Sequence, residues 1–271
     1  MAAITAQDVK RLRDATGVGM MDAKRALSEN DGDFDAAAEW LLKQGLMKAA
    51  AREERENSEG AIALGTAGRA AALVQLKSET DFVAKSPDFA KLVQDAADLV
   101  AAEGEDAISK LQPRLDELTI SLKENMGWGG VVRIEPAEGN VMDAYLHVQN
   151  DRGVNGVLVE LAGATSELAH EVALHIAFAK PTVVTRADIA ADDVEKQRAL
   201  LLEITKQEGK PEPAWPKIVE GRLTGWFGRV GEPGKPGGAL LEQPWTADEK
   251  QTVTQALGDA KVVRFAQVLI G

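Results

Sequence analysis

Few side chains in this sequence are suited to catalysis, and their spacing assembles none of the common catalytic or metal sites. The 271 residues include no cysteine and three histidines, which excludes thiolate metal sites, a cysteine nucleophile and disulfides. His170 and His175 are five residues apart, not the four that place two ligands on one helix face; we expect both to pack a helix. The sequence has no GxGxxG, GxxxxGK[ST] or GxSxG motif. It therefore predicts no catalytic residue, metal site or cofactor.

The most suggestive group is the polar stretch around Phe82. Leaving a phenylalanine in water costs about 1.5–3 kcal/mol relative to burying it. Either Phe82 folds back onto its own core, or it is a wedge for a partner with Asp81 beside it as an anion. Met20 and Met21 are a second candidate contact, because methionine adapts to a partner's groove. We expect one of these two methionines to be in the core.

Two other groups admit a plain structural interpretation. The stretch Gly127-Trp128-Gly129-Gly130 precedes an expected strand and contains no lysine, so we interpret it as a turn. His147 alternates with Tyr145 along an expected strand, so the two side chains point to the same side. They are either a half-buried pair or a contact site.

Charge and hydropathy narrow the class of protein. Asp and Glu number 43 against 31 Lys and Arg, a formal net charge of −12. Nucleic acids and anionic membranes need a basic face, so we expect direct contact with neither. No apolar run approaches the ~20 residues that span a bilayer, and the charged N-terminus is unlike a signal peptide. We expect a cytoplasmic protein.

Helical patterns come first along the chain. Residues 5–45 predict three short helices, with Thr5 and Asp8 as a capping box and Asp33 as a later N-cap. Gly45 is expected to end the third helix. Residues 46–60 read as a helical tail and a linker, so the first helices are expected to form a small, separate module.

A unit of β-hairpin plus helix then occurs twice. Strands are expected around residues 62–64 and 71–76, with a helix at 88–101; the second copy has strands at 142–148 and 155–161 and a helix at 166–178. The first copy has six more residues between strand and helix, within residues 77–86. A long loop on a rigid scaffold is a typical functional site.

The remaining segments are predicted as follows: helical residues 108–125, a strand at 131–134, an antiparallel helical hairpin within 188–228, a flexible loop at 231–238, a helix from its cap Thr246 to Leu257, and a strand at 262–270.

Several motifs together resemble the bacterial elongation factor Ts family. They run in order along nearly the whole chain: residues 12–27 (LRDATGVGMMDAKRAL), Gly32-Asp33, Trp40, residues 80–85 (TDFVAK), Tyr145-x-His147, residues 156–160 (GVLVE), His175 to Pro181, and residues 209–211 (GKP), 219–222 (VEGR) and 241–244 (LEQP). Trp226, residues 231–238 and an end at Gly271, without the C-terminal extension of longer members, depart from the family pattern.

The resemblance implies an α+β fold in four parts. These are a three-helix, ubiquitin-associated-like (UBA-like) module at residues 1–46, a linker at 47–60, a core N-subdomain at 61–138 and a core C-subdomain at 139–271. The two subdomains are expected to be similar hairpin-and-helix units. Residues 188–228 are expected to form a coiled-coil protrusion.

The resemblance also implies a guanine-nucleotide exchange factor for elongation factor Tu in translation, without covalent chemistry. Such a factor binds the GDP-loaded GTPase and its nucleotide-free form. By position, Thr80, Asp81, Phe82 and Val83 correspond to the loop that displaces Mg²⁺. Arg13, Met20, Met21 and His147 correspond to partner contacts.

Composition alone fits a rival class equally well, a non-exchanging interaction protein in which a helical adaptor is tethered to a β-rich scaffold. The longer loop at residues 77–86 favours exchange weakly, and the resemblance favours it strongly. A metabolic enzyme is a distant third, for want of acid–base or nucleophilic groups.

Overall fold

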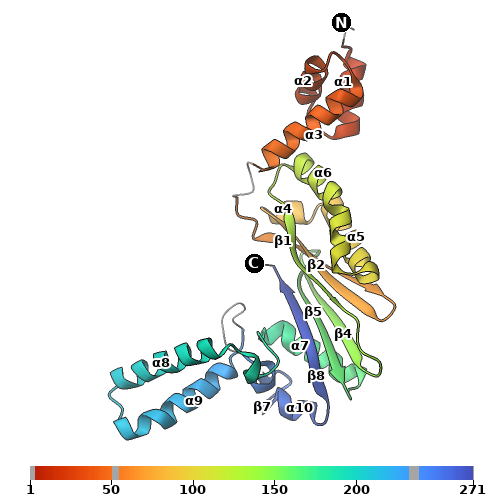
Figure 1. The fold of residues 1–271 in the computed structure, drawn as a ribbon. Helices are drawn as coiled ribbons and strands as arrows, with labels where there is room; N and C mark the ends of the chain where they lie inside the picture. The colour runs from red at the N-terminus through yellow and green to blue at the C-terminus, as the bar shows by residue number, and fades with distance from the viewer. Residues whose placement is uncertain (1–3, 51–54, 232–237, 271) are drawn as a thin grey trace.

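The fold combines helices with a six-stranded antiparallel sheet and a small two-stranded one. The computed structural model describes residues 4–50, 55–231 and 238–270. Figure 1 shows a helical module at one end, a central body of sheet and helices, and a helical hairpin projecting near the other end. Among the described residues, no helix combines the length and apolar character that crossing a bilayer requires.

The N-terminal module consists of α1 (Ala6–Thr16), α2 (Met20–Glu29) and α3 (Phe34–Ala50). The predicted capping box is confirmed: Asp8 N donates to Thr5 Oγ1 over 3.2 Å, and Thr5 N donates to Asp8 Oδ2 over 3.0 Å. Asp33 caps α3, since its Oδ1 accepts from Ala36 N at 2.9 Å. The module has its own small core: Val9, Leu12, Ala23, Ala26, Leu27, Ala37 and Leu41.

Gly45 does not end the third helix, contrary to our expectation. α3 continues to Ala50. At Gly45 it crosses α6 (Gln112–Leu122), where an added Cβ would lie 2.8 Å from the Ile120 side chain. The glycine therefore permits a close approach of two helices.

Six strands build the main sheet: β1 (Glu59–Ala67), β2 (Ala70–Ser78), β3 (Gly127–Ile134), β4 (Val141–Gln149), β5 (Arg152–Ala162) and β8 (Lys261–Leu269). All pairs are antiparallel. β2 lies between β1 and β3, and β5 lies between β4 and β8. The two halves are joined at the bridge between Ile62 and Gly153.

The two halves pack against each other and each carries a helix. α5 (Pro87–Glu103) packs on β1 and β2, and α7 (Ser166–Ala179) packs on β4 and β5. Between the halves, Leu73 approaches Gly156 so closely that an added Cβ would lie 2.5 Å from it. The predicted repeat of hairpin and helix is confirmed for these elements.

The turn predicted at residues 127–130 is wrong, because these residues belong to β3. The register of β2 and β3 shifts at Gln75, whose side chain faces the glycines. A Cβ on Gly129 would lie 2.3 Å from Gln75 Oε1, which accepts a hydrogen bond from Gly130 N. Gln75 Nε2 donates to Leu269 O, so the glycines make room for an amide that ties β2 to β8.

The projecting hairpin consists of α8 (Ala191–Gln207) and α9 (Trp215–Phe227), which pack side by side (Figure 1). Arg222 crosses between them, with Nη2 2.7 Å from Glu208 Oε2. An apolar cluster at the hairpin's base includes Ile189, Leu223, Phe227 and Ala239.

The last helix starts later than expected. α10 (Val253–Leu257) is capped by Thr252, and Thr246 instead contacts His175. The other elements are α4 (Asp81–Ala84), the small sheet of β6 (Pro244–Trp245) and β7 (Asp248–Thr252), and 3-10 helices at Glu105–Leu111, Arg186–Asp188, Glu212–Ala214 and Leu240–Glu242. Of the loop predicted at 231–238, residues 232–237 lie outside the described residues.

Candidate functional site

The stretch predicted as a loop contains one helical turn, α4, between β2 and α5. Thr80 is its N-cap: the backbone there is extended, and Oγ1 accepts from Val83 N at 3.3 Å. Ala84 is buried and Val83 packs against the core beneath α5. α4 is therefore fixed at its start by a cap and on its inner face by the core.

Phe82 points away from this anchored face. Its side chain is 83% exposed, so the alternative in which it folds back onto its own core is wrong. A large apolar side chain left in water on a fixed turn is available to a partner.

Asp81 is held as an anion beside Phe82. Lys85 Nζ donates to Asp81 Oδ2 at 2.6 Å. That hydrogen bond is the main reason why the pKa of Asp81 lies below its ordinary value, and the charge of Arg152 lowers it further. Arg152 begins β5 and pairs with Glu59 at 2.7 Å, so a cation from the second hairpin lies near α4.

The backbone before α4 is held by a carboxylate that sequence reasoning missed. Glu124 Oε1 accepts from Thr80 Oγ1 at 2.5 Å, and Glu124 Oε2 accepts from the backbone N–H groups of Glu79 and Thr80, each at 3.1 Å. In return, Glu79 Oε1 accepts from Asn125 N at 2.6 Å. Nothing in the spacing of residues this far apart could have predicted the pair.

The candidate contacts of the N-terminal module are exposed. Met20 and Met21 are 45% and 77% exposed, so the expectation that one of them is in the core is wrong. Both lie at the start of α2, just after the turn that follows α1. Arg13, in the last turn of α1, has an exposed side chain 3.9 Å from Asp14.

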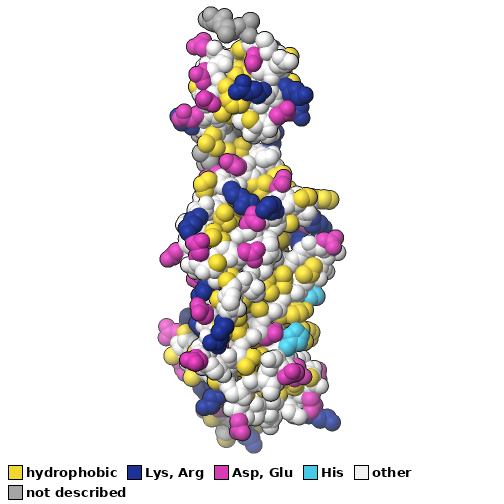
Figure 2. Space-filling model, turned by 90° about the vertical axis from the view of Figure 1, so that its right-hand side faces the viewer, with side chains coloured by type: hydrophobic (Ala, Val, Ile, Leu, Met, Phe, Trp, Pro, Cys, Tyr) yellow, Lys and Arg dark blue, Asp and Glu magenta, His cyan; other side chains and the backbone are white. Residues whose placement is uncertain are grey.

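His147 lies on β4, in the other half of the sheet. Tyr145 Oη and His147 Nδ1 are 3.2 Å apart, so the two side chains share one side of the strand as predicted. His147 is exposed, as are Phe178 and Leu174 on α7. Figure 2 shows histidine side chains among hydrophobic ones along one edge of the molecule.

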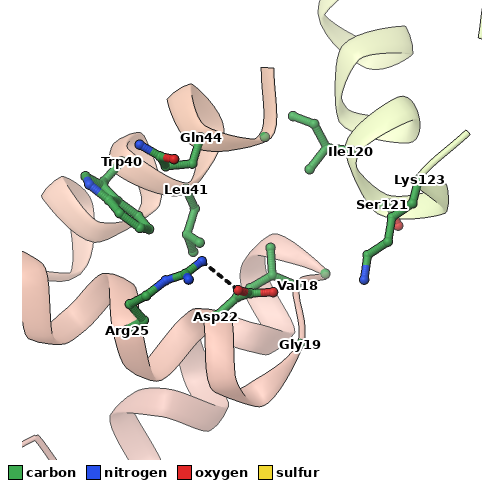
Figure 3. A pocket seen from close by; sticks show the side chains of 12 residues that line it. Val18, Gly19, Asp22, Arg25, Trp40, Leu41, Gln44, Ile120, Ser121 and Lys123 are labelled. Carbon is green, nitrogen blue, oxygen red and sulfur yellow. Dashed lines mark hydrogen bonds and ion pairs between the residues drawn. The ribbon is translucent and has the colours of Figure 1, made fainter. Parts of the chain in front are cut away.

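A small pocket marks the joint between the N-terminal module and α6 (Figure 3). Its volume is about 60 Å³, and Trp40, Leu41 and Ile120 supply much of its apolar lining. Ile120 points from α6 toward the module. Lys123 also lines this pocket, so Glu124 is the residue that follows the joint in the sequence.

The predicted site residues therefore occupy three places: α4, the start of α2 with the end of α1, and β4. Each place presents side chains outward. These features are typical of a protein that acts by contacting another macromolecule.

Comparison with known proteins identifies the family. The family model described as Elongation factor TS matches residues 79–271. The chain is 41% identical over 285 residues to "Elongation factor Ts" of Clavibacter michiganensis subsp. michiganensis, with all of both chains covered. It is 41% identical to the protein of that name from Kineococcus radiotolerans, over 285 residues and all of both chains. The same identity holds over 281 residues for Mycobacterium ulcerans, covering 100% of this chain and 99% of the relative. The chain belongs to the elongation factor Ts family.

Proposed function

We propose that this chain is a cytoplasmic guanine-nucleotide exchange factor for the GTPase elongation factor Tu, acting in translation elongation. It binds the GDP-loaded GTPase, promotes release of GDP and leaves the nucleotide-free form to take up GTP. Family membership supports this assignment, and the exposure of Phe82 on an anchored turn is the observation that carries it.

The mechanism assigned to α4 is a wedge beside an anion. Phe82 enters between helices of the GTPase, where burial offsets the cost of its exposure. The same movement displaces the Mg²⁺ that bridges the nucleotide phosphates, with Asp81 acting as a nearby negative charge. Loss of that ion removes a large local positive charge, so affinity for GDP falls. Thr80 and Val83 hold the wedge in place.

The other exposed residues supply binding. Arg13, Met20 and Met21 contact the GTPase domain, and His147 contacts another domain of the partner. Contacts away from the nucleotide allow the factor to remain bound while GDP leaves. The coupling is reciprocal. If this protein lowers the affinity of the GTPase for GDP by some factor, GDP lowers the affinity of the GTPase for this protein by the same factor.

We also propose the domain division that this role requires. Residues 1–46 are a UBA-like module, 47–60 a linker, 61–138 and 139–271 the two core subdomains, and 188–228 a coiled-coil protrusion. The separate core of the module and the paired helices α8 and α9 support this division.

The test is release of fluorescent GDP from elongation factor Tu. We expect the wild-type protein to accelerate release, and the Phe82→Ala, Asp81→Ala double variant to lose most of that acceleration while still binding. No acceleration by the wild type would refute the exchange function. Unchanged acceleration by the double variant would refute the wedge. Dependence of the effect on Mg²⁺ concentration tests the displacement of the ion.

A non-exchanging adaptor is the second candidate, supported by the acidic composition and the exposed methionines. It predicts binding to the GTPase with no change in the rate of GDP release. The same assay therefore separates the two functions.

A further inference from the structure

We propose that Glu124 is a positioning residue for α4 and holds Phe82 in the orientation that nucleotide exchange requires. The inference deepens the proposed function and rests on it. Glu124 lies in the short segment between α6 and β3, and Thr80 lies in the segment between β2 and α4. The end of β2 pairs with the start of β3, so the two segments are neighbours. Its side chain does not belong to any of the three exposed places described above.

α4 needs external support because it has only four residues. A single helical turn fixes several backbone dihedrals in return for very few hydrogen bonds, so it is unstable alone. Val83 and Ala84 anchor its inner face, but they fix neither the entry of the backbone nor the direction of the exposed Phe82. The entry is fixed where Glu79 and Thr80 precede the turn.

Glu124 satisfies three donors at this entry. They are the backbone N–H groups of Glu79 and Thr80 and the hydroxyl of Thr80. Hydrogen bonds to a charged acceptor are roughly twice as strong as those between neutral groups. One carboxylate therefore restrains two consecutive peptide units directly before Asp81.

The Thr80 hydroxyl connects this carboxylate to the turn itself. Because its proton is donated to Glu124, its lone pairs face the turn and one accepts from Val83 N. The cap of α4 thus depends on the direction that Glu124 imposes on the hydroxyl. Ser78 adds a further restraint, with Oγ donating to Thr80 O at 2.9 Å.

The restraint is reciprocal. Glu79 Oε1 accepts from Asn125 N at 2.6 Å and lies 3.4 Å from Arg55 Nη1. Each of the two carboxylates therefore accepts from the backbone of the segment that carries the other. The pair clamps the strand leading into α4 to the segment leaving α6, and α6 is the helix that meets the N-terminal module at Ile120.

The first test measures GDP release from elongation factor Tu as a function of exchange-factor concentration. Glu124→Gln keeps the shape of the side chain but removes its charge, and its amide N–H₂ group cannot accept the proton of the Thr80 hydroxyl or of a backbone N–H, as the replaced oxygen did. We expect its maximal rate to fall about tenfold, with the half-saturating concentration changed by less than about twofold, because the contacts that bind the partner are intact. Glu117→Gln, at an exposed acid on the preceding helix α6, is the matched control and should behave as wild type.

A second test follows the turn directly and does not depend on exchange. The natural chain has no cysteine, so Phe82→Cys gives a single site for a nitroxide spin label. We expect Glu124→Gln to increase the mobility of that label and Glu117→Gln to leave it unchanged. Thr80→Val, which removes the connecting hydroxyl, should have the same effect as Glu124→Gln, and the two changes should not add.

The outcomes separate the inference from the function on which it rests. If the wild type fails to accelerate GDP release, the exchange function fails, whatever the label does. If the wild type is active but Glu124→Gln keeps its maximal rate, or slows exchange without mobilising the label, the positioning role is overturned. If Glu124 has only a structural role, Glu124→Gln should lower the thermal unfolding midpoint and reduce rate and affinity together. That result also overturns the positioning role.

Discussion

Lys85 Nζ lies 2.6 Å from Asp81 Oδ2, so the anion beside the exposed Phe82 already has a cation of its own. Both side chains remain partly open to solvent. The pair therefore orients Asp81 and lowers its pKa without removing it from the surface that a partner would meet. The two residues can be tested separately, because only one of them supplies the negative charge.

Asp81→Asn removes that charge and keeps the shape of the side chain. We expect the maximal rate of GDP release from elongation factor Tu to fall about tenfold, if the anion acts on the nucleotide site. Lys85→Met should keep most of the activity, because an aspartate with an ordinary pKa of about 3.9 stays ionised at neutral pH. Equal losses in the two variants would assign the effect to the ion pair and contradict a role for the anion.

The two exposed methionines are expected to contribute affinity and little else. The double variant Met20→Ala, Met21→Ala removes apolar surface from the start of α2 without touching the module's core. Burying a methionine is worth about 1.5–3 kcal/mol, so the half-saturating concentration should rise at least tenfold while the maximal rate is kept. Leu200→Ala, at an exposed position on the projecting hairpin, is the control. A lower maximal rate with unchanged affinity would contradict this assignment.

The joint between the N-terminal module and α6 should open when Gly45 gains a side chain. Gly45→Val places its Cβ about where the Ile120 side chain lies, and a β-branched residue has few rotamers with which to avoid it. We expect the radius of gyration measured by small-angle X-ray scattering to increase. The second change Ile120→Ala should restore it, because the collision is with a side chain and not with backbone. No change in the single variant would contradict the close packing of α3 on α6.

Local patterns predicted the elements well, because caps and hydrophobic spacing act over a few residues. The Thr5–Asp8 capping box and the paired hairpins are of this kind. The errors arose where a distant residue decides the local structure. The Ile120 side chain leaves no room for a Cβ at Gly45, and the Gln75 side chain leaves none at Gly129 in β3. The spacing of residues in the sequence does not predict these contacts.

The candidate site divides in the same way. Phe82 and Asp81 were identifiable as an aromatic side chain and an anion in a polar stretch, and the family resemblance gave them a role, but the sequence left open whether Phe82 is buried or exposed. What holds them was not identifiable: Lys85 follows within α4, but Glu124 comes from a different element after a long intervening chain. Sequence reasoning therefore found the groups that face outward and the capping Thr80, and missed Lys85 and Glu124, which orient them.

A buried histidine gives the fold a dependence on pH. His175 Nε2 lies 3.1 Å from Gln243 Oε1, and its Nδ1 lies 3.3 Å from Thr246 N. Because Gln243 Nε2 donates to Ala179 O and Arg229 O, its oxygen is left to accept from His175. The ring is then neutral, with a proton on Nε2 and an acceptor at Nδ1. Burial lowers the pKa of His175, and the hydrogen bond that its ring donates to Gln243 offsets part of that effect.

The sign of the effect on stability follows from this lowered pKa. Below the unfolded-state pKa of about 6.5, the unfolded chain binds a proton at this position that the folded chain does not, so the free energy of unfolding falls as pH falls. Urea unfolding should therefore show a free energy of unfolding that decreases as the pH falls below about 6.5. His175→Gln should lose that dependence, although it is less stable at neutral pH.

His170 provides the matched control for this prediction, because it lies on the same helix but is exposed, with Nδ1 3.2 Å from Asp143 Oδ2. His170→Gln should therefore retain the acid-sensitive contribution of His175. The three histidines can also be followed individually by nuclear magnetic resonance. In the folded protein, the His175 ring should stay neutral to lower pH than a histidine of the unfolded chain, whose pKa is about 6.5. Titration of His175 at the ordinary value would contradict the buried, neutral ring and the stability change derived from it.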